Sequence, residues 1–248
     1  MLNLKPKPRV FVLGGLMLAT TLIPFYAFAA MIAQNQLESK QSTKVEPALL
    51  PTVDYQAPEP SSPKESSIRQ TRSNRYNESP MHVKELPPNV DQLPLNSHFW
   101  LGLSSIPAGQ SDAIIVGEVK DAQAQLSNDK TGVYSEFTIR VEQTLKAPTG
   151  IPPTSIVVER SGGAVRFPSG RIVRYEVHNQ GMPRVGGRYL LFLKYNSDGD
   201  DYSLLTGYEF INGNVVPLDN VEGLFTKYHG WSEIAFLDVV ATTIKEGQ

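Results

Sequence analysis

The chain of 248 residues contains no cysteine. This absence excludes disulfide bonds, thiolate chemistry, cysteine-ligated zinc and N-terminal lipoprotein acylation together. A folded domain in this chain must therefore be held by its hydrophobic core and its hydrogen bonds, for which about 150 residues are ample.

Signatures of catalysis and metal binding are also missing. The histidines are few and scattered, and none belongs to an HExxH motif: His82, His98, His178 and His229. Ser161–Gly163 lacks the form of a nucleophile elbow, so a turn is the better interpretation. Asn196–Asp201 resembles a calcium loop, but Asp201 and Gly207 stand where an EF-hand needs Gly and Glu. A hairpin turn is favoured there, with a weak surface calcium site as the alternative. We expect no catalytic residue, no cofactor and no metal.

An excess of positive charge is lacking as well. The formal net charge is −2, which argues against nucleic acid as a partner. The first 33 residues are the exception, because they hold Lys5, Lys7 and Arg9 and no acidic residue.

Residues 10–33 form an uncharged, mostly apolar run behind this basic flank. A signal peptide is one interpretation, because Ala27 and Ala29 suit cleavage before Ala30 and Pro24 ends the first apolar stretch. A signal anchor is the other, and it is preferred because the run outlasts that site and reaches the length of about 20 residues that a membrane span needs. In both cases the basic flank stays inside, so the rest of the chain is expected outside the cytoplasm, membrane-tethered or secreted.

Residues 34–95 are rich in proline and polar residues. Such a composition buries too little apolar surface to offset the entropy of ordering, so a disordered linker is predicted. Arg69, Arg72 and Arg75 recur at helical spacing within it. A solvated stretch of linker is the favoured interpretation, and contact with anionic lipid or a cell-wall polymer is the alternative.

The strongest structural signal lies at residues 133–147, VYSEFTIRVEQTLKA. Its odd-numbered positions are mostly apolar and its even-numbered ones mostly polar, which predicts one long strand with a dry and a wet face. A strand of this length in a small domain must bend and serve two layers, which favours a barrel.

Residues 96–248 are predicted to form the folded domain. Further strands are expected at residues 113–119, 155–160, 164–167, 171–178, 188–195, 202–206, 208–211 and 215–217, separated by turn sequences. The apolar cluster at 98–103 suggests a turn or two of helix, and residues 232–246 an amphipathic C-terminal helix capped by Ser232 or Gly230. The fold class predicted is mainly β: a small antiparallel barrel of OB type, or a sandwich, with one C-terminal helix.

Two segments carry a family likeness. Ser111–Val119 with the long strand after it, and Gly187–Leu193, resemble netrin/TIMP-like OB-fold modules and, more closely, uncharacterised extracytoplasmic bacterial proteins of that plan. The likeness covers roughly residues 111–195 and implies the fold. The eukaryotic modules are rich in cysteine and this chain has none, so no functional residue is carried over.

An arginine-rich stretch supplies the one candidate ligand-binding face. Arginine forks suit carboxylates and phosphates, and aromatic rings suit sugars. The candidate residues are Arg166, Arg171, Arg174, Tyr175 and Arg188. Solvated or loosely paired surface arginines are the plainer interpretation. The preferred function is a membrane-tethered, non-enzymatic binding or structural module of the cell envelope, with an envelope protein or polymer as partner. The alternative is a secreted hydrolase with an unrecognised site.

Overall fold

A computed structural model describes residues 50–147 and 154–247. The predicted signal or anchor segment at 1–33 and the first part of the predicted linker lie outside these residues. No helix within the two described ranges has the length and apolarity needed to cross a membrane.

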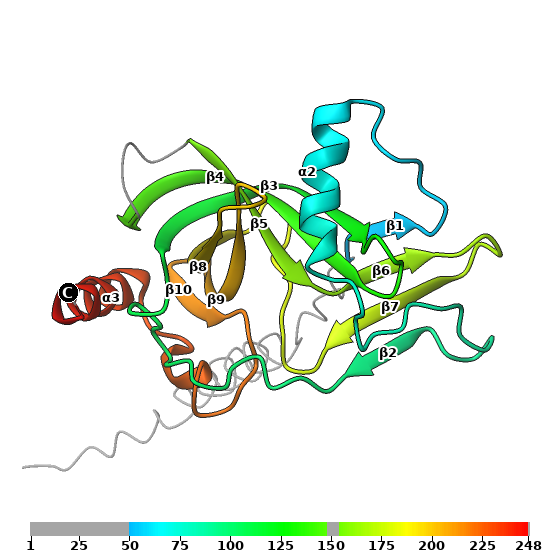
Figure 1. Cartoon of the computed structure of the whole chain (residues 1–248). Coiled ribbons are helices and arrows are strands. Elements are labelled where there is room, and N and C mark those ends of the chain that lie inside the picture. The colour runs from blue at the N-terminus through cyan, green and yellow to red at the C-terminus, as the bar shows by residue number, and fades with distance from the viewer. Residues whose placement is uncertain (1–49, 148–153, 248) are drawn as a thin grey trace, which may run out of the picture. The chain divides into compact units, whose positions relative to one another are not determined.

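The described fold is mainly β, with one helix near each end (Figure 1). Its elements are, in chain order, β1 (Thr52–Asp54), α2 (Pro63–Asn74), β2 (Gln92–Leu95), β3 (Ala113–Leu126), β4 (Val133–Lys146), β5 (Ser155–Ser161), β6 (Gly163–Arg166), β7 (Ile172–Val177), β8 (Arg188–Asn196), β9 (Asp201–Ile211), β10 (Asn214–Pro217), the 3-10 helix η1 (Thr226–Tyr228) and α3 (Glu233–Glu246). The strands predicted at 202–206 and 208–211 are one strand, and residues 98–103 form turns in place of helix.

The larger sheet has the order β10-β9-β5-β4-β3-β8, and β9 pairs with β8 as well as with β5. The pairings therefore run in a ring through β3, β4, β5, β9 and β8 back to β3. All of them are antiparallel except the short contact between β5 and β9. A smaller sheet has the order β1-β6-β7-β2, in which β1 and β2 are parallel to their neighbours.

The long strand β4 contributes to two cores, as its length predicts. Phe137 and Ile139 are fully buried in a cluster with side chains of β3, β5 and β8. Val133, at the other end of the dry face, packs with Val165, Val173 and other residues of the smaller sheet. The pairing with β3 shifts register beside Gly117, where a Cβ atom would lie 2.6 Å from Ile139 Cγ2 and 2.7 Å from Arg140 O. Glycine therefore permits the register shift at this position.

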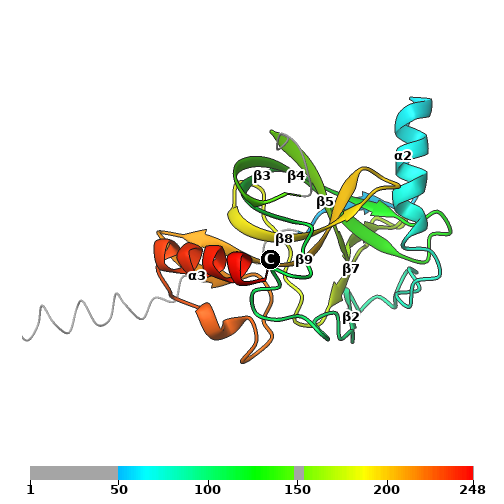
Figure 2. The same ribbon diagram turned by 60° about the vertical axis from the view of Figure 1, so that its left-hand side comes forward.

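The C-terminal helix α3 packs on the outer face of the larger sheet, at the opposite end of the described domain from α2 (Figure 2). Ser232 caps it, because its Oγ accepts a hydrogen bond from the Ala235 amide at 3.3 Å. The buried face consists of Phe236, Val240 and Ile244, whereas the apolar side chain of Ile234 is 76 % exposed.

Residues 50–95 correct the prediction of a disordered linker. They contain β1, α2 and β2, and they belong to the same compact unit as the rest, which begins at Ala48. Only a few of their side chains are buried and apolar: Val53, Met81, Val83 and Leu86. These suffice because the segment adds strands to both edges of the β6–β7 hairpin, where hydrogen-bonding groups and an apolar surface already exist. The composition of the segment would prevent folding only if the segment had to form a core alone.

Candidate functional site

Four of the five residues of the candidate ligand-binding face contact residues 54–92 of the same chain. Arg166 pairs with Asp54 of β1 at 3.1 Å, and both side chains are exposed. Arg171 donates hydrogen bonds to the carbonyl oxygens of Leu86, Pro87 and Val90. Arg174 reaches Gln92 of β2 at 3.5 Å. Tyr175 is fully buried, and its hydroxyl donates to Lys84 O at 2.7 Å.

Arg188 lies apart from these four, on β8 of the larger sheet. It pairs with Glu142 and Glu233 at 2.7 Å each, and its guanidinium stacks over the ring of Phe210 at 5.2 Å. The structure therefore does not bring the five residues to one surface. The chemistry predicted for the arginines, binding of carbonyl and carboxylate oxygens, is present, but its partners are intramolecular.

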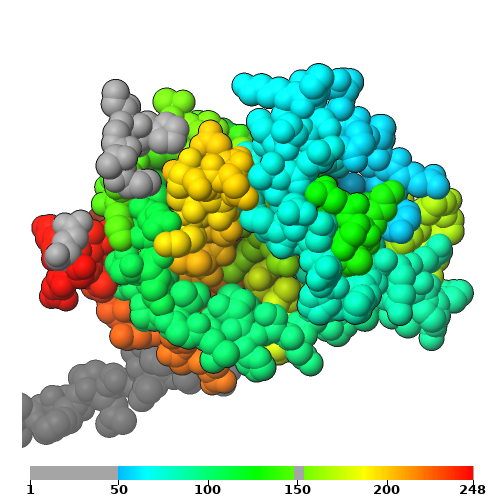
Figure 3. Space-filling view, in the orientation of Figure 1, coloured from blue at the N-terminus to red at the C-terminus, as the bar shows by residue number. Residues whose placement is uncertain are grey.

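A second charged cluster, which sequence reasoning missed, lies between α2 and the larger sheet. Its acidic members come from separate segments: Glu136 on β4, Glu159 on β5, Asp198 in the β8–β9 turn and Asp201 at the start of β9. We call these four residues the acidic face. In the space-filling view α2, in cyan, lies against the β8–β9 turn, in gold (Figure 3).

Two arginines bind the acidic face: Arg72 in α2 and Arg75, the residue that caps the C-terminal end of the helix. Arg75 Nη2 lies 2.6 Å from Asp201 Oδ2 and 2.9 Å from Glu159 Oε2, and Arg75 Nη1 lies 2.8 Å from Asp198 Oδ1. Arg72 Nε lies 3.2 Å from Asp201 Oδ2, and Arg72 Nη1 lies 3.5 Å from Glu136 Oε1. The three-residue spacing of the arginines, visible in the sequence, places them on one side of the helix.

Two aromatic rings complete the contact. Tyr76 stacks on Tyr134 with the ring centroids 4.2 Å apart, and the Ser73 and Tyr134 hydroxyls share a hydrogen bond of 3.0 Å. Tyr134 is fully buried, although its even number placed it on the wet face of the strand. The α2 segment covers the ring of Tyr134. The wrong face was therefore predicted for Tyr134 because residues 34–95 were predicted to be a disordered linker.

Glu159 is the most strongly perturbed carboxyl group of the acidic face. Burial raises its pKa to about 7; the nearby charge of Asp201 adds to the rise and Arg75 opposes it. Burial also raises the pKa of Glu136, against the influence of Arg72. A carboxyl group titrating near pH 7 suits proton transfer. However, Glu159 Oε1 accepts hydrogen bonds from Asn196 and Ser203 and Oε2 binds Arg75, so no oxygen of this carboxyl faces a substrate site.

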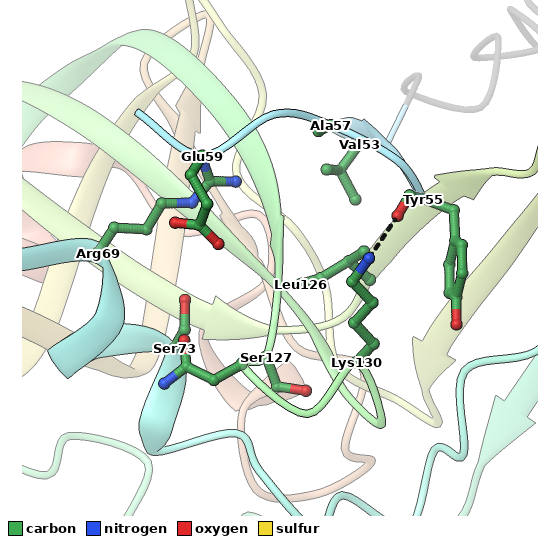
Figure 4. A pocket seen from close by; sticks show the side chains of 10 residues that line it. Val53, Tyr55, Ala57, Glu59, Arg69, Ser73, Leu126, Ser127 and Lys130 are labelled. Atoms are coloured by element: carbon green, nitrogen blue, oxygen red, sulfur yellow. Dashed lines mark hydrogen bonds between the residues drawn. The ribbon is translucent and has the colours of Figure 1, made fainter. Parts of the chain in front are cut away.

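Two hollows flank α2. A cavity of about 50 Å³, room for one or two waters, lies between β1, α2 and the β3–β4 turn (Figure 4). Lys130 enters it and donates to Tyr55 O at 3.2 Å. On the other side, a groove separates α2 from β3 and β4 and is lined by polar side chains that include Arg69, Gln123 and Gln125. The helix therefore lies against the sheet along a polar seam.

No group of three metal-ligating side chains with suitable geometry occurs in residues 50–147 and 154–247. Asn196–Asp201 forms the turn between β8 and β9, where Asp198 and Asp201 bind Arg75.

Comparison with known proteins gives no assignment: no protein-family model matches this chain, and no curated protein matches it with significant similarity.

Proposed function

We propose that this chain is a membrane-tethered, extracytoplasmic, non-enzymatic binding module of the cell envelope, built on an OB-like barrel. The ring of strand pairings supports the barrel. Numbered by their order in the chain, the five strands follow one another around the ring as first (β3), second (β4), third (β5), fifth (β9) and fourth (β8), and the third and fifth are parallel to each other. Small barrels of this type bind ligands on the face of their second and third strands and on adjacent loops.

The observation that carries a binding role is the acidic face. Its carboxyl groups come from β4 and β5, the second and third strands of the ring, from the β8–β9 turn and from the start of β9. It already holds charged side chains of a segment distant in sequence, which is the chemistry of a recognition surface. Both carboxyl oxygens of Glu159 are bound by neighbouring side chains, and this gives no support to the hydrolase alternative.

The apolar run at 10–33 behind Lys5, Lys7 and Arg9 supports the location. A reporter enzyme active only in the cytoplasm, fused after Gln248, is expected to be silent in the full-length chain. The matched control is the same fusion without residues 1–33, which should be active because it stays inside. Equal activity of the two fusions would disprove export. Size analysis of the exported chain would separate a retained anchor from cleavage near Ala29.

A further inference from the structure

The α2 helix has almost no apolar contact with the sheet beneath it. Its sequence, PKESSIRQTRSN, contains one apolar side chain other than its first proline, Ile68, and its only buried residue is Ser73. The chain on either side is anchored by apolar side chains, Val53 before the helix and Met81, Val83 and Leu86 after it. Ionic contacts, hydrogen bonds and the Tyr76–Tyr134 stack therefore hold α2 in place between two fixed ends.

The acidic face has more carboxyl groups than there are arginine side chains paired with them. Four carboxyl groups meet two arginines there. Asp201 is fully buried, yet its Oδ1 has no hydrogen-bond partner among the described residues, and neither has Arg75 Nε. A buried carboxylate oxygen without a donor is costly. The face thus has capacity for a further donor that α2, as placed, does not supply.

We propose that the acidic face is a docking surface for an arginine-bearing helical segment of another protein, and that α2 occupies it in the absence of that partner. The partner helix carries two arginines one turn apart, to fork the carboxylates of Glu159 and Asp201, and an aromatic ring to stack on Tyr134. This proposal names the ligand class for the binding module proposed above and rests on that function.

The charge of the surface decides the class of partner. A face built of carboxyl groups offers no favourable contact to the phosphates of nucleic acid or to anionic polymers, whereas forked arginine–carboxylate contacts give both strength and direction. Because α2 is tethered, it competes at an effective concentration in the millimolar range. A partner must therefore bind more tightly than α2 or be held close by, which makes α2 an internal competitor that selects for a strong ligand.

The test uses the purified full-length chain in detergent and a fluorescent peptide of residues 60–80 added in trans. The Arg72→Ala/Arg75→Ala variant, whose own helix is weakened, should bind the peptide about tenfold or more tightly than the wild type. Arg140→Ala/Arg166→Ala removes two exposed arginines elsewhere and should bind like the wild type. Binding should fall steeply between about 50 mM and about 500 mM salt.

Two controls test the specificity of this binding. A peptide with the same composition in scrambled order should not bind, and adding Asp201→Asn to the double variant should abolish binding. Equal binding of native and scrambled peptides, or no binding by a double variant that still unfolds cooperatively, would overturn the proposal. If the double variant does not fold, Arg75→Ala replaces it. Failure of that variant to fold would also overturn the proposal, because α2 would then be an integral part of the fold. The assay is independent of cellular location, so its failure is separable from that of the reporter fusions.

Discussion

At the scale of single residues, the charged side chains find partners that lie far away in the sequence. Glu159 pairs with Arg75, and Glu176 accepts a hydrogen bond from Gln92 at 2.7 Å. The chemistry of these residues could be predicted from their type. Their partners could not, because the partner segment was taken for a linker.

The raised pKa of Glu159 has a consequence for stability. The ordinary value is 4.5 and the folded value is about 7, so between these pH values the folded protein binds a proton that the unfolded chain releases. The stabilisation is complete below about pH 4.5 and is lost as the pH rises through 7. One pKa unit corresponds to about 1.4 kcal/mol.

Urea unfolding at a series of pH values measures this effect. Between pH 5 and pH 8.5 the wild type should lose on the order of 2 kcal/mol more unfolding free energy than Glu159→Gln, which cannot titrate there. Glu142→Gln, which removes an exposed carboxylate paired with Arg140 and Arg188, should follow the wild-type profile. Parallel profiles for the wild type and Glu159→Gln would refute the assigned pKa.

At the scale of elements, side-chain periodicity predicted the strands of the larger sheet well. Residues 113–117 of β3 and 189–193 of β8 are buried on both faces, as their continuous apolar sequences indicate, because α3 covers one side and the core shared with β4 and β5 lies on the other. Period-two alternation predicted β4 correctly at Phe137 and Ile139 and failed at Tyr134. The failure occurs where a distant segment covers a strand face, which alternation within one strand cannot reveal.

Neighbouring substitutions in β4 test its face assignment. Ile139 is fully buried, and Ile139→Ala should lower the unfolding free energy by about 2–5 kcal/mol through lost burial and a residual cavity. Thr138 points to the opposite face and is half-buried, so Thr138→Ala should cost about 0.5 kcal/mol or less. Urea unfolding of the chain from residue 48 gives both values. Equal losses would mean that both faces are packed, and a larger loss at Thr138 would reverse the assignment.

At the scale of the whole molecule, composition placed the start of the folded domain near residue 96, whereas the compact unit begins at Ala48. The earlier boundary has a physical basis in the smaller sheet, whose two edges are β1 and β2. Pro94, on the edge strand β2, is compatible with this position because an edge strand leaves one side free of ladder hydrogen bonds. Pro63 occupies the first turn of α2, where its missing N–H is not needed. These two prolines, which contributed to the prediction of disorder, therefore lie where ordered structure tolerates them.

Truncated chains test whether the folded domain begins near residue 48 or near residue 96. A chain of residues 96–248 lacks β1 and β2, exposes Val165 and Val173, and leaves the buried hydroxyl of Tyr175 and the guanidinium of Arg171 without their carbonyl partners. Unpaired strand edges beside an apolar surface promote association. Residues 48–248 should therefore unfold in one cooperative urea transition, whereas residues 96–248 should aggregate or unfold without a defined midpoint.

Protease treatment of the full-length chain should accordingly leave a resistant fragment that begins near residue 50. Equal midpoints for the two truncated chains, or a resistant fragment beginning near residue 96, would show that residues 50–95 are dispensable to the fold and would restore the boundary that composition suggests.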